Sequence, residues 1–233
     1  MESRMKLHKL SERIYYSDYE EERDRPALGY VKGDRFSVAV DAGHSIKHLE
    51  EFYELLKQEN LPLPSLTLIT HWHWDHTFAM HAVNGLTAAL EETDRLLRDF
   101  IAERSEENDR KFLRLDPSIA REYEGQKLIV VPADITFRDK MKVDAGNVTL
   151  NLFKTVSPHC DDAVLIEIPQ EKALFLGDAI SGVFPDWIAD PVKKKELIRV
   201  LEGLDVNTFI GAHWPVWTDR EELIRYIEDE REE

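Results

Sequence analysis

Short apolar runs rich in β-branched and aromatic residues recur along the chain, with turn-forming residues between them. Such runs are typical of buried or half-buried strands. They predict strands over residues 13–16, 36–41, 66–70, 128–131, 148–154, 163–168, 173–176 and 206–210.

A different spacing, with apolar residues three or four positions apart, predicts helices over residues 45–58 and 191–201. Asp190 can cap the second of these helices, and Pro191 suits its first turn. A third helix is predicted to open at Thr218, because the spacing from Thr218 to Glu221 fits a capping box. Since strands and helices are interleaved, the predicted fold class is α/β or α+β.

Residues 91–126 form a segment dense in Glu, Asp and Arg, with apolar pairs at roughly helical spacing. The pattern predicts one or two amphipathic helices. A solvated helical insertion is favoured over a lid that covers a site, although the sequence leaves both open. No linker, low-complexity tract or repeat marks a second domain, so residues 1–233 are predicted to form a single domain.

Composition narrows the class of protein. The composition, 42% hydrophobic and 33% charged residues, is that expected of a soluble globular protein. The apolar runs are too short to span a membrane. The N-terminal segment lacks the apolar stretch of a secretory signal, and the single cysteine, Cys160, excludes an internal disulfide, so we expect a cytoplasmic location. The net charge of −16 disfavours nucleic acid as a partner, because it repels polyanions. We expect a small-molecule substrate; the oligomeric state is not predicted.

The stretch THWHWDHT, residues 70–77, concentrates metal-binding side chains. His71 and His73 are two positions apart in an extended segment, so they project to the same side and can bind one metal ion together. Asp75 and His76 follow, and a turn there would direct them at a second, adjacent ion. A core or surface role is the usual interpretation of a lone histidine, but this string is improbable by chance in a chain with only nine histidines.

Three further polar residues come directly after predicted strands: His159 in TVSPHCDD, Asp178 in ALFLGDAI and His213 in TFIGAHW. Strand ends are where open sheets commonly place functional groups. Gly177 allows a sharp turn that would direct the Asp178 carboxylate away from the sheet edge. Each of these residues would be unremarkable alone.

In this order, HWHWDH, SPH, GDA and GAH resemble the metallo-β-lactamase superfamily of αββα-sandwich metallohydrolases, and VAVDAG around Asp41 extends the resemblance. The resemblance implies two mixed β-sheets flanked by helices. It also implies two metal-binding groups, one of His71, His73 and His159, the other of Asp75, His76 and His213, with Asp178 as the bridge. Asp41 is expected to support these ligands from behind rather than to bind metal. The chain has Thr77-Phe78-Ala79 where the family has glycines, and Ser157-Pro158 before His159 where it commonly has Pro-Gly.

The implied chemistry is hydrolysis, with a water or hydroxide held between two divalent ions as the nucleophile and Asp75 or solvent as the proton donor to the leaving group. Zn²⁺ is the first expectation from the histidine-rich set, and iron or manganese would also fit. The alternatives are a mononuclear iron oxygenase acting on thiols or persulfides and a catalytically silent metal-binding protein.

Family members cleave β-lactams, thioesters, lactones, phosphodiesters and RNA, and the fold does not decide between them. A β-lactamase is disfavoured because an export signal is lacking and because Asp178 is present, whereas the family's lactamases lack that bridge. RNA is disfavoured by the net charge. The ligand pattern is similar to that of glyoxalase II, but the chain ends soon after His213, without that enzyme's C-terminal helical domain. We therefore expect hydrolysis of a small-molecule ester, thioester, lactone or phosphoester.

Aromatic residues near the ligands are candidates for substrate contact. Trp187 and Trp214 are the favoured pair. The other candidates are Trp72, Trp74, His81, Phe184 and Asp186. If the alternation of an extended strand continues through the histidine motif, Trp72 and Trp74 point away from the ligands, toward the core or a lid.

Overall fold

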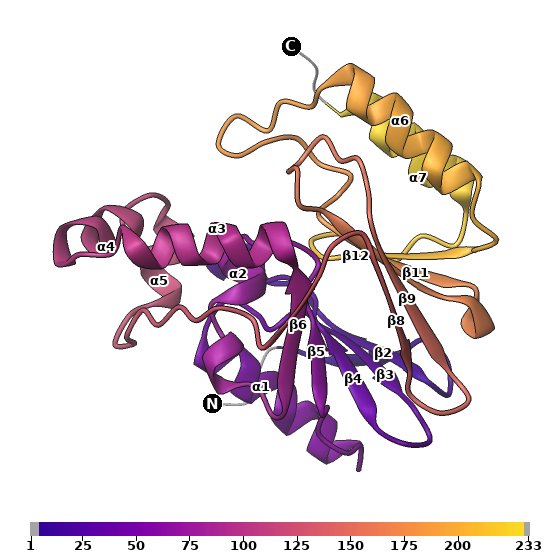
Figure 1. Cartoon of the computed structure of the whole chain (residues 1–233), viewed down its shortest axis with the longest axis horizontal. Helices are drawn as coiled ribbons and strands as arrows, with labels where there is room; N and C mark the ends of the chain where they lie inside the picture. Colours follow the sequence, from indigo (N-terminus) through magenta and orange to yellow (C-terminus); the bar gives the residue numbers. More distant parts are fainter. Residues whose placement is uncertain (1–4, 231–233) are drawn as a thin grey trace.

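The computed structural model describes residues 5–230, which form two β-sheets packed face to face with helices on their outer faces (Figure 1). The first sheet has the strand order β1-β2-β3-β4-β5-β6-β7. These strands span Leu7–Lys9, Ile14–Ser17, Gly29–Lys32, Ser37–Val40, Leu66–Leu68, Leu86–Leu90 and Ile135–Phe137. Pairing is antiparallel from β1 to β4 and parallel from β4 to β7, so this sheet is mixed, as predicted.

The second sheet has the order β12-β11-β10-β9-β8. Its strands, from β8 to β12, span Lys140–Asp144, Thr149–Lys154, Val164–Ile168, Ala173–Gly177 and Thr208–Gly211. Only β11 and β12 are parallel, so this sheet is mixed as well.

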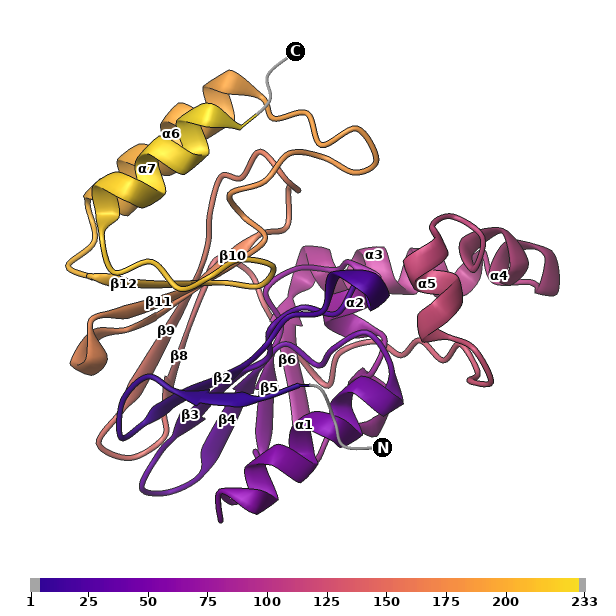
Figure 2. The ribbon, with the colours of Figure 1, turned by 180° about the vertical axis from the view of Figure 1, so that it is seen from behind.

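The helices cover the two outer faces. Helices α1 (Ile46–Gln58) and α3 (Glu91–Ala102) lie against the first sheet, while α6 (Pro191–Glu202) and α7 (Arg220–Asp229) lie together on the second (Figure 2). The short helices are η1 (Glu21–Arg23), α2 (Trp74–Thr77), η2 (Met80–Ala82), α4 (Glu106–Phe112), α5 (Pro117–Glu122) and η3 (Pro169–Glu171). No helix in the described part of the chain combines the length and apolarity needed to cross a membrane.

Three apolar layers hold this αββα sandwich together. Leu68 and Val38 of the first sheet meet Leu152 and Ile166 of the second in the central layer. The outer layers contain the helix stripes, such as Phe52 of α1 beneath the first sheet. All of these side chains are buried, and each such burial contributes about 1.5–3 kcal/mol.

Local signals explain several helix ends. The Ser45 side chain caps α1 by accepting a hydrogen bond from the His48 backbone, and Asp190 caps α6, as predicted. The predicted start of the last helix is wrong by one residue. Asp219, not Thr218, accepts hydrogen bonds from the Glu221 and Glu222 backbone, because a carboxylate is an equally good cap and is adjacent to the first turn.

The predicted strand at residues 128–131 is not formed. Leu128 and Val130 are buried in the core beside α1 and α3, but this segment has no strand partner. All four residues are apolar and their burial alternates, but this alternation arises without pairing to another strand. Residues 91–126, predicted to contain one or two helices, contain three: α3, α4 and α5.

Candidate metal centre

The candidate functional residues meet at one edge of the sandwich, where several strands end. Asp41 follows β4, His71 and His73 follow β5, and Asp178 and His213 follow β11 and β12. The parallel pairs β4/β5 and β11/β12 run their carboxyl ends to the same edge, which is why residues far apart in sequence come together there. Gly177 has φ +54°, and a Cβ at this position would lie 2.7 Å from Thr70 Oγ1. Glycine thus allows both the turn and the close approach of the two sheets.

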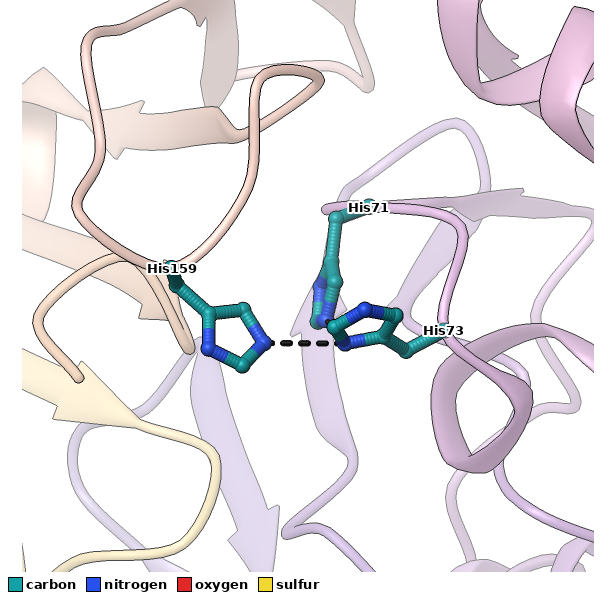
Figure 3. A group of neighbouring side chains, drawn as sticks. All are labelled: His71, His73 and His159. Atoms are coloured by element: carbon teal, nitrogen blue, oxygen red, sulfur yellow. Dashed lines mark hydrogen bonds between the residues drawn. The ribbon is translucent and has the colours of Figure 1, made fainter. Parts of the chain in front are cut away.

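Three histidines form the first cluster (Figure 3). His73 Nδ1 lies 3.1 Å from His71 Nε2 and 2.9 Å from His159 Nε2. The three rings approach one another edge to face, so their nitrogen atoms, rather than their faces, converge.

Hydrogen bonds behind the rings define which nitrogens face the centre as lone pairs. His159 Nδ1 lies 2.7 Å from the carbonyl oxygen of Gly182 and must donate to it, so His159 Nε2 of the neutral ring is an acceptor. Thr70 Oγ1 donates to the Asp41 carboxylate and accepts from His71 Nδ1 at 3.2 Å. His71 Nε2 is therefore also a lone-pair acceptor. His73 Nδ1 carries at most one hydrogen, which cannot satisfy both, so the cluster suits a shared cation.

Two histidines and two carboxylates form the second cluster: Asp75, His76, Asp178 and His213. Asp75 Oδ2 lies 3.1 Å from His76 Nε2 and 3.0 Å from His213 Nε2. The short helix α2 produces this arrangement, because it turns the chain after His73 and directs Asp75 and His76 inward, where both are buried.

Asp178 faces both clusters. Its Oδ2 lies 3.5 Å from the Nε2 atoms of His76 and His213 and 3.9 Å from His159 Nε2. The structure thus brings together all seven residues that the resemblance implied as ligands, with Asp178 between the two groups.

Asp41 is behind these residues and joins neither cluster. Its carboxylate accepts hydrogen bonds from the Thr70 backbone N–H at 2.8 Å and from His76 Nδ1 at 2.8 Å. When His76 is neutral, as a metal ligand must be, this second bond assigns the remaining hydrogen to Nδ1 and directs the Nε2 lone pair at the centre. The position of Asp41 agrees with the supporting role expected from the sequence.

Buried polar atoms without hydrogen-bond partners show whether the two clusters suit a metal ion. Among residues 5–230, His76 Nε2 and Asp178 Oδ1 are buried and form no hydrogen bond. Buried polar atoms normally have partners, so these two atoms are available to a bound ion. Imidazole and carboxylate are ligands that borderline divalent ions accept, and the donor sets of both clusters fit such ions.

The two clusters differ in charge. Burial, aided by His159, lowers the pKa of His73 to about 3, and burial also places the pKa of His71 well below its ordinary value. In the second cluster burial disfavours the protonated form of His213, but the carboxylates of Asp178 and Asp75 outweigh this effect and raise the pKa of His213 to about 9. Burial likewise opposes ionisation of Asp178, and His213 and His76 outweigh it, which lowers its pKa to about 2. Without metal, His71 and His73 of the first cluster are neutral, whereas the second cluster contains balanced opposite charges.

A cavity of about 510 Å³ opens from the centre to the surface. Its wall includes His73, Asp75, His159, Asp178 and His213. Trp187 and Trp214, the favoured candidates for substrate contact, line it, and so do Trp74 and Phe184. Trp72, His81 and Asp186 are not part of this wall.

Trp74, expected to point away from the ligands toward the core or a lid, packs in the core and also lines the cavity. The alternation of an extended strand stops after His73, because α2 begins at Trp74. The Trp74 indole packs against Phe112 and Phe184, and its Nε1 donates to Asp24 Oδ2 at 2.7 Å. Trp74 is consequently both a core residue and part of the cavity wall.

Sequence reasoning missed several residues at the site. Asp24 lines the cavity, and burial together with the nearby Asp75 charge raises its pKa to about 7. Leu115, Asp116 and Ser118 show that the helical insertion contributes to the cavity wall. No motif marks these residues, which reach the cavity only through the folding of η1 and of the connection from α4 to α5.

Asp162 was also missed. It is fully buried, and its Oδ2 accepts hydrogen bonds from the Trp72 backbone N–H at 2.8 Å and from Thr93 Oγ1 at 2.7 Å. It ties the loop containing His159 to the loop of His71 and His73. The doublet Asp161-Asp162 beside His159 is the only signal that pointed to it.

Two mixed sheets, outer helices and a histidine–aspartate centre at the shared edge define a metal-binding αββα sandwich. The chain belongs to the metallo-beta-lactamase superfamily, whose sequence model matches residues 28–230. No curated protein matches the chain.

Solved structures show the same fold at low identity. A metallo-beta-lactamase from Pontibacter korlensis superposes with TM-score 0.69 at 18% identity, covering 97% of this chain and 100% of that one. A metallo-beta-lactamase from Hirschia baltica gives TM-score 0.68 at 16% identity, with coverage of 97% and 98%. The DIM-1 metallo-beta-lactamase gives TM-score 0.64 at 15% identity, with the same coverage. The fold class predicted from the sequence is confirmed.

Proposed function

We propose that this protein is a dinuclear metallohydrolase of small molecules that cleaves an ester, thioester, lactone or phosphoester bond. The observation that carries the proposal is the position of Asp178, whose Oδ2 lies within 3.5–3.9 Å of nitrogens from both clusters. A carboxylate between two groups of ligands is suited to hold two ions at adjacent positions.

In this proposal His71, His73 and His159 bind one ion, and Asp75, His76 and His213 bind the other. Two divalent ions, with Zn²⁺ proposed for this nitrogen-rich set, would supply a water of lowered pKa and polarise an oxygen of the substrate. Asp75 lines the cavity beside the candidate ligands, so Asp75 or solvent is proposed to pass a proton to the leaving group.

The cavity supports a small-molecule substrate. Its volume of about 510 Å³ is within the range typical of small-molecule sites. The aromatic side chains of Trp187 and Trp214 offer apolar contact area beside the centre.

Metal content and hydrolysis together test this proposal. We expect protein purified without added metal to bind two equivalents of Zn²⁺ and to hydrolyse at least one member of a panel of esters, thioesters, lactones and phosphoesters. His73→Ala should lose metal and activity together. His81→Ala is the matched control, because His81 does not line the cavity and, among residues 5–230, its ring bonds only to the Phe78 carbonyl.

Other outcomes separate the alternatives. One iron per chain, oxygen consumption with a persulfide and no hydrolysis would identify the single-iron oxygenase. Bound metal without turnover on any substrate would identify a silent metal-binding protein. A His73→Ala variant that retained both metal and activity would refute the ligand set.

A further inference from the structure

The cavity wall is acidic beyond the candidate ligands. Glu21, Asp24, Asp116 and Glu230 line it, and among the described residues that line it there is no lysine or arginine. Beyond His213 of the metal centre, the described wall therefore offers four carboxyl groups to a bound molecule and no cationic side chain that could pair with an anion.

Two of these carboxyl groups are positioned by the fold and still have an oxygen to offer. Asp24 Oδ2 accepts from Trp74 Nε1 at 2.7 Å, and Asp116 Oδ1 accepts from the Ser118 backbone at 2.8 Å as the cap of α5. Within residues 5–230 the second oxygen of each has no hydrogen bond, and neither residue forms an ion pair. Many other carboxylates of this chain pair with Arg or Lys, for example Asp99 with Arg95. The acidity of the cavity is thus not neutralised locally.

Aromatic rings accompany these carboxyl groups. Trp187, Trp214 and Phe184 line the same wall, and the Trp187 ring, about half exposed, stacks parallel to His159 at 6.2 Å. The face of an indole attracts cations, and carboxylates beside it add to that attraction. The combination differs from an acidic surface patch because the same cavity is lined by Asp178, whose Oδ1 is buried and has no hydrogen-bond partner among residues 5–230.

From these observations we infer that the substrate carries a cationic group, such as a substituted ammonium, that binds in the outer cavity between Asp24, Asp116 and the indole rings. This inference rests on the proposed hydrolase function and specifies its substrate class. The scissile bond is then directed at the metal centre while the cationic end is held toward the acidic rim. Substrates whose remote part is anionic are disfavoured, because that part would face carboxylates without a compensating cation.

A pair of probes with the same shape and different charge tests the inference. Choline and 3,3-dimethylbutanol differ by a quaternary nitrogen in place of a quaternary carbon. Quenching of tryptophan fluorescence by each probe can be measured on metal-free and Zn²⁺-loaded protein, so this readout needs no turnover. We expect choline to bind about tenfold more tightly than the alcohol in both forms.

The double variant D24N/D116N should remove that preference without damaging the fold. Asn tolerates the left-handed conformation of residue 24, its amide oxygen can still accept from Trp74, and it is a good helix cap at residue 116. The alcohol should bind this variant as it binds the wild type, which also reports that the cavity is intact. The control E196Q/E222Q removes the same charge at exposed positions outside the cavity and should keep the tenfold preference.

Equal binding of choline and the alcohol by the wild type would overturn the inference, as would a preference that survives D24N/D116N. Turnover then separates this outcome from failure of the proposed function. We expect acetylthiocholine to be hydrolysed with a higher kcat/KM than 3,3-dimethylbutyl thioacetate. Selective binding of choline without hydrolysis of any compound in the panel would refute the hydrolase and retain the cation preference. Hydrolysis without any charge preference would support the hydrolase and refute the cation preference.

Discussion

His76 donates its Nδ1 hydrogen to Asp41 Oδ2 over 2.8 Å, and both side chains are almost completely buried. Asp41 has φ +64° at the end of β4, so its carboxylate turns toward the loop after β5. This contact links the rear of a candidate ligand to the first sheet and directs His76 Nε2 toward Asp75 and Asp178.

Asp41→Asn should therefore weaken metal binding at the second cluster by about 10- to 100-fold, the usual effect of removing a partner behind a ligating histidine. Asn tolerates positive φ, so the backbone should be retained. Competition with a chromophoric chelator measures the metal affinity of each cluster, and the affinity of the first cluster should change less than that of the second. Asp205→Asn, at an exposed position, serves as the control, and an unchanged second affinity in the Asp41 variant would contradict the role of this contact.

Metal loading should release protons from His76 and His213 of the second cluster. The pKa of His213 is about 9 and that of His76 is raised well above its ordinary value, mainly by Asp75 and Asp41 against the effect of burial, so both are protonated at neutral pH without metal. A metal ligand must be neutral imidazole, and these protons must leave. In the first cluster, burial lowers the pKa of His73 to about 3 and that of His71 well below its ordinary value, so these two ligands need no such release.

Affinity at the second cluster should accordingly rise as pH increases toward about 9, while affinity at the first should be nearly constant across the same range. Calorimetric titration of Zn²⁺ in two buffers of different ionisation enthalpy counts the protons. Equal proton release for the first and second equivalents would show that the charge difference between the clusters is wrong.

Asp162 should control the geometry of the first cluster. Asp162→Ala removes the acceptor of the Trp72 backbone N–H and Thr93 Oγ1, which frees the loop of His71 and His73 from the loop of His159. We expect metal affinity at the first cluster to fall about tenfold. Asp162→Asn, whose amide oxygen can accept both bonds, should restore most of it. Equal losses in the two variants would mean that the carboxylate acts by its charge rather than by positioning.

The buried pair Arg25 and Glu122 should stabilise the attachment of the helical insertion. Arg25 Nε lies 2.8 Å from Glu122 Oε2, and the two side chains are 2% and 0% exposed. Glu122→Ala leaves Arg25 buried with weaker partners and should lower the free energy of unfolding by about 3 kcal/mol. The exposed pair Arg95 and Asp99 offers the comparison, since Asp99→Ala should cost less than about 1 kcal/mol. Urea denaturation measures both, and similar losses would contradict the assignment.

Much of the fold and of the site could be predicted from local sequence. The caps at Ser45 and Asp190, the strand that ends just before Asp178 and the turn at Gly177 depend on neighbouring residues, and the structure contains them all. The resemblance carried by HWHWDH, SPH, GDA and GAH implied that these side chains would meet, and the apolar runs before His71, Asp178 and His213 agreed with a position at a sheet edge.

Contacts between distant segments decided the rest. Whether residues 128–131 form a strand depends on a partner strand that the segment itself does not contain. Trp74 faces the cavity because a helical turn replaces the extended alternation, and Asp24 meets it across 50 positions in sequence. The sequence by itself determined which residues have the chemistry to bind metal. Tertiary structure alone decided which side chains line the cavity beside the candidate ligands, since its wall is assembled from loops whose positions depend on the packing of both sheets.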